Sequence, residues 1–340
     1  MSTVANRALS VIVLTVALAS TAQAQDDVVE VTNGDRIKGT VTRLDRGQLS
    51  FRTDSMGTIS IAWADVVTVT STQNLDVELS SGVRHTGTIS TPSPGQLVVQ
   101  AASGPTQPID MKTVVRMTTI GAGVRARTSG SIDFGASFTK ADGARSYTLD
   151  ASAANRTRSY ESDVTFASWL QRRDGTDTLT RNDLALDVRR LLSGRWFAVG
   201  KFGLQEDDEL DLDWRVVAGA GVGRKLVQSN RMHLLIEGGL DYDGESYGNE
   251  VSTDHSAEVF AGVDWDYFSP SWASEAKIVA TTYISLARQR ARLDVDAQMR
   301  RDLFWNMYWS VNVFESFDSD PPGDRERSDL GVSFTVGWSF

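Results

Sequence analysis

Apolar residues alternate one by one with polar or small residues from about residue 129 to the end of the chain. Successive side chains of a β-strand point to opposite faces, so this alternation predicts strands with one apolar and one polar face. In the final stretch, Val332, Phe334, Val336, Trp338 and Phe340 fall on one face, and only small residues lie between them. The C-terminal part of the chain is therefore expected to be all-β.

Twelve segments show this alternation, and clusters of turn-forming residues separate them. They cover residues 132–138, 147–153, 160–170, 184–188, 196–204, 210–222, 232–240, 257–265, 272–280, 293–299, 305–313 and 330–340. Alternating segments of roughly 10 residues are typical of strands that cross a membrane as a closed barrel. We therefore expect residues 121–340 to form an antiparallel transmembrane β-barrel of about 12 strands, with ten or fourteen as alternatives.

The composition agrees with a barrel better than with a helical membrane protein. Hydrophobic residues make up 41% of the chain and the mean hydropathy is −0.23. A helical membrane protein would be far more apolar, whereas a barrel needs apolar side chains only at every second strand position. A soluble β-sandwich also alternates on one face, so the pattern alone leaves that fold open.

The N-terminus favours the membrane barrel over the sandwich. Residues 1–24 have the features of a signal peptide: Arg7 is positively charged, residues 8–19 are apolar, and Ala22-Gln23-Ala24 fits a cleavage site. The apolar run is shorter than the roughly 20 residues that a spanning helix needs. Export, together with the aromatic end of the last alternating segment, predicts a protein of the outer membrane.

The connections between segments suggest an orientation. Those after even-numbered segments are short, and those after odd-numbered segments are longer and more charged. Outer-membrane barrels have short periplasmic turns and longer outer loops, so both barrel ends are expected on the periplasmic side. The aromatic residues near the short connections would form one girdle at the membrane interface: Trp196, Tyr267, Phe268, Trp272, Phe304, Trp305 and Trp338.

From Ser129 to Phe340 the chain resembles the DUF481 family, a group of salt-induced outer-membrane proteins. The resemblance rests on charged inward faces, acidic loops and the ending Gly-x-Ser-Phe-Thr-Val-Gly-Trp-Ser-Phe, which begins at Gly331. Outer-membrane barrels in general share such an ending, so it supports the class more than the family. The resemblance implies a barrel in the outer membrane and says little about mechanism.

Two repeats precede the barrel, at residues 25–72 and 73–120. They match without a gap at an offset of 48, so that Gly34 corresponds to Gly82 and Gly39 to Gly87. Short alternating stretches and an Asn33-Gly34 turn predict several strands in each repeat, which suggests a pair of small SH3-like or Sm-like β-units. They are expected in the periplasm. Residues 28–117 could bind a periplasmic protein or the cell wall, or could serve as a plug or spacer.

Charged residues occupy the face of the predicted strands that must point into the barrel. An Arg or Lys on the lipid face would cost about 2 to 4 kcal/mol at mid-membrane, which fixes the direction of these side chains. The candidates for the lumen are Arg181, Asp183, Asp187, Arg189, Asp213, Arg215, His233, Glu237, Asp264, Lys277, Arg292, Asp294 and Asp296. Such residues could line a narrow pore, or could form salt bridges that fill the interior.

Several other functions find no support in the sequence. The formal net charge of −10 argues against nucleic-acid binding. Neither His233 nor His255 has a convincing Ser partner, so we expect no enzyme activity. Residues 241–254 form an acidic stretch, but a solvated loop is a better interpretation than a Ca²⁺ site. No metal and no cofactor are expected.

Two functional hypotheses remain. The first is a narrow pore for small solutes or ions, with a periplasmic N-terminal β-domain. The second is a non-conducting structural barrel that anchors a periplasmic binding or scaffold module, in a role related to envelope stress. In both cases the partners are outer-membrane lipid and the barrel-assembly machinery, which the last strand through Phe340 would engage.

Overall fold

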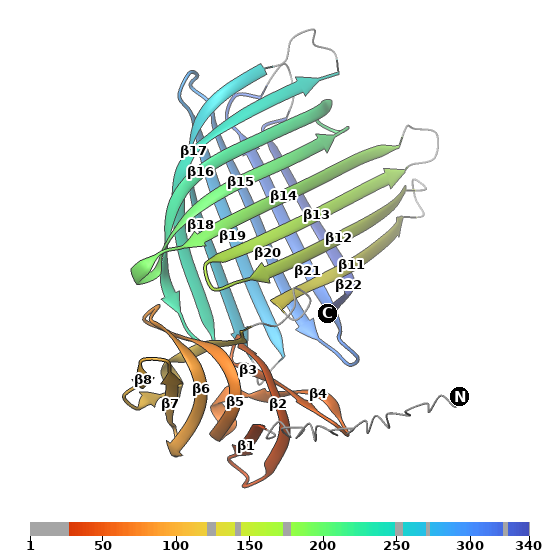
Figure 1. Cartoon of the computed structure of the whole chain (residues 1–340). Coiled ribbons are helices and arrows are strands. Elements are labelled where there is room, and N and C mark those ends of the chain that lie inside the picture. Colours follow the sequence, from red (N-terminus) through yellow and green to blue (C-terminus); the bar gives the residue numbers. More distant parts are fainter. Residues whose placement is uncertain are drawn as a thin grey trace, which may run out of the picture.

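The computed structural model describes residues 27–120, 127–139, 144–172, 178–248, 254–269, 273–321 and 326–339. These residues form a small N-terminal β-domain and a large β-barrel (Figure 1). The expected signal peptide, Trp272 and Phe340 lie outside the described residues. No helix among the described residues is both long enough and apolar enough to span a bilayer.

The N-terminal domain is one ten-stranded sheet that folds on itself. Its strands are β1 (Asp27–Val31), β2 (Arg36–Asp45), β3 (Gln48–Thr53), β4 (Gly57–Ala62), β5 (Val66–Leu79), β6 (Arg84–Ser93), β7 (Gln96–Ala101), β8 (Gly104–Pro105), β9 (Ile109–Asp110) and β10 (Val114–Thr119). The long strand β5 serves both halves of the domain, because its first half pairs with β1 and its second half with β6 and β10.

Elements of the domain recur at the spacing of the sequence repeat. β6 begins 48 residues after β2, β7 begins 48 residues after β3, and the 3-10 turns η1 (Trp63–Asp65) and η2 (Met111–Thr113) have the same separation. Turn hydrogen bonds recur as well, since the Gly34 amide donates to the Val31 carbonyl and the Gly82 amide to the Leu79 carbonyl, both at 2.8 Å.

The domain has a single apolar core between its layers. Its residues with no exposed surface are Val29, Val41, Leu44, Leu49, Phe51, Val69, Leu75, Val77, Leu97, Val99, Val114 and Met117. They come from both repeats, so neither repeat buries its apolar face alone. The Trp63 indole also joins the repeats, because it donates a hydrogen bond to the Met111 carbonyl at 2.8 Å.

The C-terminal part is a closed antiparallel barrel of twelve strands, which confirms the predicted fold. The strands are β11 (Thr128–Thr139), β12 (Ala144–Arg156), β13 (Tyr160–Arg172), β14 (Leu179–Leu191), β15 (Trp196–Asp207), β16 (Leu212–Gln228), β17 (Met232–Tyr247), β18 (Asp254–Ser269), β19 (Ser274–Ser285), β20 (Ala291–Asp302), β21 (Met307–Asp318) and β22 (Ser328–Ser339). β22 pairs with β11 from Ser131–Ser339 to Phe134–Val336, and this pairing closes the barrel.

The outer face of the barrel carries exposed apolar side chains on nearly every strand. Examples in strand order are Phe134, Leu149, Val164, Val188, Phe202, Val222, Leu240, Val263, Ile278, Met299 and Val332. Such a surface is stable against lipid hydrocarbon. In the expected girdle, Trp196, Tyr267, Phe304, Trp305 and Trp338 are exposed. Phe268 is not, because it faces inward, is 3% exposed and packs edge-on against His233.

The N-terminal domain sits under one end of the barrel (Figure 1). We call this end the proximal end and the opposite end the distal end. The proximal end carries the connections after β12, β14 and β16, and domain residues contact Arg158, Arg195 and Asn230 in these turns. The short connections of the barrel and its N-terminal domain therefore share one end.

Candidate functional site

Charged side chains on the inner face of the barrel meet in the middle of the lumen. Glu237 of β17 is the centre of one group, because it pairs with Arg189 of β14 at 3.5 Å and with Lys201 of β15. Asp187 lies beside both cations, 3.7 Å from Arg189 and 3.5 Å from Lys201. β14 and β17 are not neighbours in the barrel, so the Arg189–Glu237 pair reaches across the interior.

A second group connects β14 to the last strand. The Arg181 guanidinium lies 2.8 Å from Asp183 and 2.9 Å from Asp329 of β22. It also stacks over the Phe314 ring, 4.6 Å from the ring centroid. Since β14 and β22 stand on different sides of the barrel, this contact again spans the lumen.

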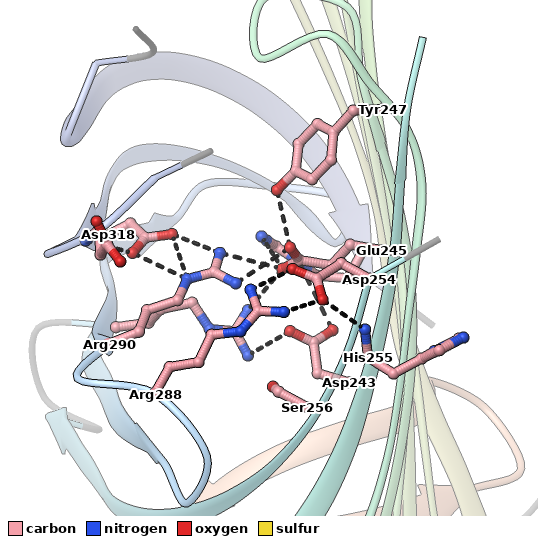
Figure 2. Close-up of polar contacts among 12 residues, drawn as sticks. Asp243, Glu245, Tyr247, Asp254, His255, Ser256, Arg288, Arg290 and Asp318 are labelled. Carbon is pink, nitrogen blue, oxygen red and sulfur yellow. Dashed lines mark hydrogen bonds and ion pairs between the residues drawn. The ribbon is translucent and has the colours of Figure 1, made fainter. Parts of the chain in front are cut away.

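The largest group lies toward the distal end and has Glu245 of β17 at its centre. Figure 2 shows the Arg290 guanidinium between Glu245 and Asp318. Its nitrogens lie 3.1 Å from a Glu245 carboxylate oxygen and 2.5 Å from an Asp318 carboxylate oxygen. Arg215 binds the same Glu245 carboxylate at 2.6 Å, and the Tyr247 hydroxyl donates to it at 2.9 Å. The Glu245 side chain is 2% exposed, so this carboxylate depends on its protein partners rather than on water.

Arg292 of β20 extends the distal group toward mid-barrel. It lies 3.0 Å from Asp243 and 2.5 Å from Glu258, and stacks over the Tyr283 ring at 4.9 Å. One position further along the inner face of β20, Asp294 accepts a hydrogen bond from Ser316 at 2.8 Å. Ion pairs thus hold this part of the interior, while Phe197, Val199 and Phe260 form a small buried apolar cluster elsewhere in the barrel.

Other inward charges remain accessible to water. Lys277 of β19 faces Asp266 across the strand pair and is exposed, as is Asp296 of β20. The side chains of Asp163 and Asp183 are 42% and 36% exposed, although both contact arginines inside the barrel. Asp264 has one buried oxygen without a hydrogen-bond partner among the described residues. Part of the lumen is therefore hydrated.

Asp213 is the predicted lumen residue that the structure places differently. The pairing of β16 with β17 shifts register between Leu212 and Trp214, and such a bulge changes which residues face inward. Leu212, expected on the outer face, is 2% exposed, while Asp213 is exposed and joins none of the ion pairs found among the described residues. The predicted inward position of Asp213 is wrong for this reason.

The expected acidic loop at residues 241–254 is also largely a strand. Asp241, Asp243 and Glu245 lie on β17 and are buried inside the barrel, where Asp243 and Glu245 meet arginines. Among the described residues, no group of His, Asp or Glu is arranged to hold a metal ion. Sequence reasoning missed these inward acids because it counted them as loop residues.

The two barrel histidines lie far from each other. His233 is at the proximal start of β17 against Phe268, where their ring centroids are 4.9 Å apart. His255 lies near the start of β18, and its Nδ1 is 2.8 Å from the Tyr242 hydroxyl. The hydrogen bonds of the described residues join neither ring to a serine.

The proximal mouth holds a contact that the sequence did not reveal. Glu78 of the N-terminal domain is 5% exposed and pairs with Arg156 at the end of β12. Its other carboxylate oxygen accepts a hydrogen bond from the Gln228 amide of β16 at 2.7 Å. Lys225 and Arg156 both bind Glu161 of β13, which continues the charge group into the barrel.

Further contacts surround Glu78. Arg84 donates to the Arg158 carbonyl, and Asn230 donates to the Val114 carbonyl at 2.9 Å. On the other side of the domain, Arg46 pairs with Glu275 of β19 at 2.7 Å and lies over the Phe268 ring. The domain is therefore held at several points of the proximal rim.

The charge environment of Glu78 favours its ionised form. Burial alone would raise the pKa of Glu78, but the nearby charges of Arg156, Arg116 and Lys225 outweigh it and lower the pKa to about 2. The same balance lowers the pKa of Asp45, where Arg116 is the main cation. The interface contact of Glu78 thus depends on a carboxylate that stays charged.

The last strand carries the predicted assembly residues. Val332, Phe334, Val336 and Trp338 are exposed on the outer face, and Phe340 lies outside the described residues. On the inner face, the Tyr308 hydroxyl donates to Asp133 at 2.5 Å, and Thr335 lies 3.4 Å from the same carboxylate. A side chain at Gly337 would collide with Asp133 and Tyr308, so this glycine makes room for the contact that closes the barrel.

The family assignment rests on the barrel. Residues 132–340 match the model of DUF481, described as a protein family of unknown function. The chain belongs to the DUF481 family. No protein of curated function matches this DUF481 chain in sequence.

Solved barrels are similar to this DUF481 chain at low identity. The translocator domain of the autotransporter NalP from Neisseria meningitidis is 14% identical, with a TM-score of 0.36 over 62% of this chain and 86% of that one. The β-domain of the Bordetella autotransporter BrkA is 10% identical, with a TM-score of 0.34 over 63% and 97%. An anion-selective porin from Comamonas acidovorans is 9% identical, with a TM-score of 0.28 over 63% and 98%.

Proposed function

We propose that this chain is a closed outer-membrane barrel that anchors its N-terminal domain at the periplasmic mouth. The observation that carries the proposal is the Glu78 contact, in which a buried carboxylate of the domain meets Arg156 and Gln228 of the barrel. Removing one partner of a buried ion pair typically costs about 3 to 5 kcal/mol. A contact of this kind favours one fixed arrangement over loose tethering.

The distal group supports a closed resting state. Arg290, which directly precedes β20, and Arg215 of β16 converge on Glu245, while the Arg181–Asp329 pair joins β14 to β22. Charged side chains that neutralise each other across a lumen leave less room for ions than charged rings that face open water. The domain contacts the rim of one mouth at several points, and the distal ion pairs narrow the other mouth.

The outer membrane is the location that fits this barrel. Its apolar outer face requires lipid, and its last strand ends in alternating Val332, Phe334, Val336 and Trp338 before Phe340. Outer-membrane lipid and the barrel-assembly machinery are its expected partners. The N-terminal domain would then lie in the periplasm, on the side of the short turns.

A narrow pore is the second candidate, and one observation favours it. The inward charges Lys277, Asp296, Asp163 and Asp183 keep water-accessible surface in the lumen. If the domain leaves the mouth, these residues could line a path for small ions. On this hypothesis the domain is a removable plug rather than an anchored module.

Cross-linking in intact membranes tests the anchor. The chain has no cysteine, so a pair at Arg84→Cys and Arg158→Cys can be joined by a short bismaleimide without side reactions. We expect efficient cross-linking for this pair and none for Arg84→Cys with Ser319→Cys, which lies at the distal end. Adding Glu78→Arg should abolish the product. Equal product with and without Glu78→Arg would contradict the proposal.

A further inference from the structure

The hairpin that docks on the barrel has a counterpart in the first repeat. We call residues 78–84 the docked hairpin and residues 30–36 the free hairpin. Both begin with Glu and end with Arg, and these two residues face each other across the strand pair in each case, Glu78 with Arg84 and Glu30 with Arg36. The sequence repeat therefore places the barrel-binding pair of residues in two positions on one domain.

The two hairpins have the same backbone. Gly34 and Gly82 have φ values of +87° and +83°. Outside each turn, the Thr32 amide donates to the Asp65 carbonyl at 2.9 Å and the Ser80 amide to the Thr113 carbonyl at 2.7 Å. Any difference in the contacts of the two hairpins therefore does not come from a difference in backbone conformation.

Their surroundings differ completely. A Cβ at Gly82 would lie 2.9 Å from the Arg195 side chain of the barrel, whereas a Cβ at Gly34 would meet nothing within 4 Å. Residues 32–36 are all exposed. In the part of the chain that the structure describes, the Glu30 carboxylate has one hydrogen bond, from the Thr68 hydroxyl at 3.5 Å.

The free hairpin is also more acidic than the docked one. Asp35 stands where the docked hairpin has Val83, and Asp65 stands where the second repeat has Thr113. The docked hairpin already recognises an arginine, since Glu78 binds Arg156 at the end of a barrel strand. Added carboxylates beside Glu30 strengthen the same preference for a cation.

We propose that the free hairpin is an interaction surface for a protein that presents an arginine beside a β-turn. The Glu30 carboxylate would receive that guanidinium as Glu78 receives Arg156. The inference rests on the proposed anchor, because the fixed docking of the domain is what leaves the free hairpin available in the periplasm. The inference specifies which chemical group of a partner protein the anchored domain would bind, namely an arginine guanidinium.

A peptide that copies the barrel turn can serve as the probe. A cyclic peptide with the sequence of residues 154–162 carries Arg156 in its native turn, and a matched peptide carries Arg156→Gln. Binding is measured by fluorescence anisotropy with the full chain in nanodiscs. We compare the wild type with Glu30→Gln and with Asp54→Asn, an exposed acid on a different turn of the same repeat.

We expect the arginine peptide to bind the wild type and the Asp54→Asn variant equally, and to bind Glu30→Gln about tenfold more weakly. The Arg156→Gln peptide should show a similar loss. Equal binding to the wild type and Glu30→Gln, or no binding of the arginine peptide up to millimolar concentration, would overturn the inference. Dimerisation of the wild type that Glu30→Gln abolishes would also overturn it, because the surface would then belong to a second copy.

The two proposals can fail separately. Loss of the Arg84–Arg158 cross-link with retained peptide binding would remove the anchor and leave the free hairpin as an arginine-binding surface. An intact cross-link without peptide binding would remove the interaction surface and leave the anchor.

Discussion

The N-terminal domain and the barrel bury different kinds of side chain in their interiors. The N-terminal domain buries apolar side chains such as Leu49 and Leu97, while ion pairs such as Glu245 with Arg290 hold much of the barrel interior beside a small apolar cluster around Phe197. The difference follows from what lies outside each part. The domain has no lipid-facing wall, so its apolar side chains must avoid water by packing in a core. The apolar side chains of the barrel instead face lipid on its outer surface. Each interior therefore has a different weak point.

Removing the central distal carboxylate should have the largest effect. Glu245→Ala would leave Arg215 and Arg290 facing each other without their shared acid, and we expect a loss of about 3 to 5 kcal/mol in barrel stability. Denaturant unfolding in detergent measures it. Glu209→Ala, which removes an exposed acid, should change little. A Glu245→Ala barrel of wild-type stability would break the comparison.

Apolar truncation inside the N-terminal domain should affect only the domain. Leu49 and Leu97 occupy equivalent positions and have no exposed surface, so Leu49→Ala and Leu97→Ala should each destabilise the domain by about 2 to 5 kcal/mol. Limited proteolysis of residues 27–120 reports this loss. The temperature at which the barrel unfolds, seen as the loss of the gel shift of the folded form, should stay at the wild-type value. An equal drop in barrel stability would show that the two interiors are not independent.

The closing contact should have an intermediate effect. Tyr308→Phe removes the hydroxyl that donates to buried Asp133, and hydrogen bonds to charged groups contribute about 1.5 to 3 kcal/mol. We expect a lower unfolding temperature of the barrel by circular dichroism. Tyr147→Phe is the control, because Tyr147 is exposed on the outer face. Matching losses in the two variants would contradict a closing role for Tyr308.

Acid should loosen the domain from the barrel by the smallest amount. The docked pKa of Glu78 is lowered from 4.5 to about 2, so its contribution is complete above 4.5 and is lost as the pH falls toward 2. At pH 4 the loss is about 1 kcal/mol. Energy transfer between dyes attached at Arg84→Cys and Arg158→Cys measures it, and the Glu78→Gln variant should show a flatter pH profile. Energy transfer in the otherwise unchanged chain that is independent of pH between 5 and 3 would count against this contact.

The sequence predicted the barrel because a strict physical demand repeats along it. Each strand must place apolar side chains against lipid. The outward direction of Phe334 and Val336 can therefore be predicted from their own strand alone. The same logic predicted opposite faces for Arg181 and Leu184. It failed at Leu212 and Asp213, because a bulge changes the facing of residues without any change in the alternation.

Partnerships inside the lumen could not be predicted from the sequence. Arg181 and Asp329 are 148 residues apart, and their contact depends on the curvature of the whole barrel. Residues 241–254 looked like a loop because acids dominate them, yet Asp243 and Glu245 are acids that a strand can carry when arginines face them. The docking of Glu78 on Arg156 was equally hidden, since both residues look like ordinary surface charges in sequence.

Ion conductance across a planar bilayer tests the central claim most directly. On the proposed closed state, the full chain, refolded and inserted at physiological salt, should show no steady stepwise current, because the domain is fixed at one mouth and the Glu245 group narrows the other. The same preparation must contain folded barrels, which the gel shift verifies. Reproducible stepwise currents from the wild type would contradict the closed anchor and support the narrow pore.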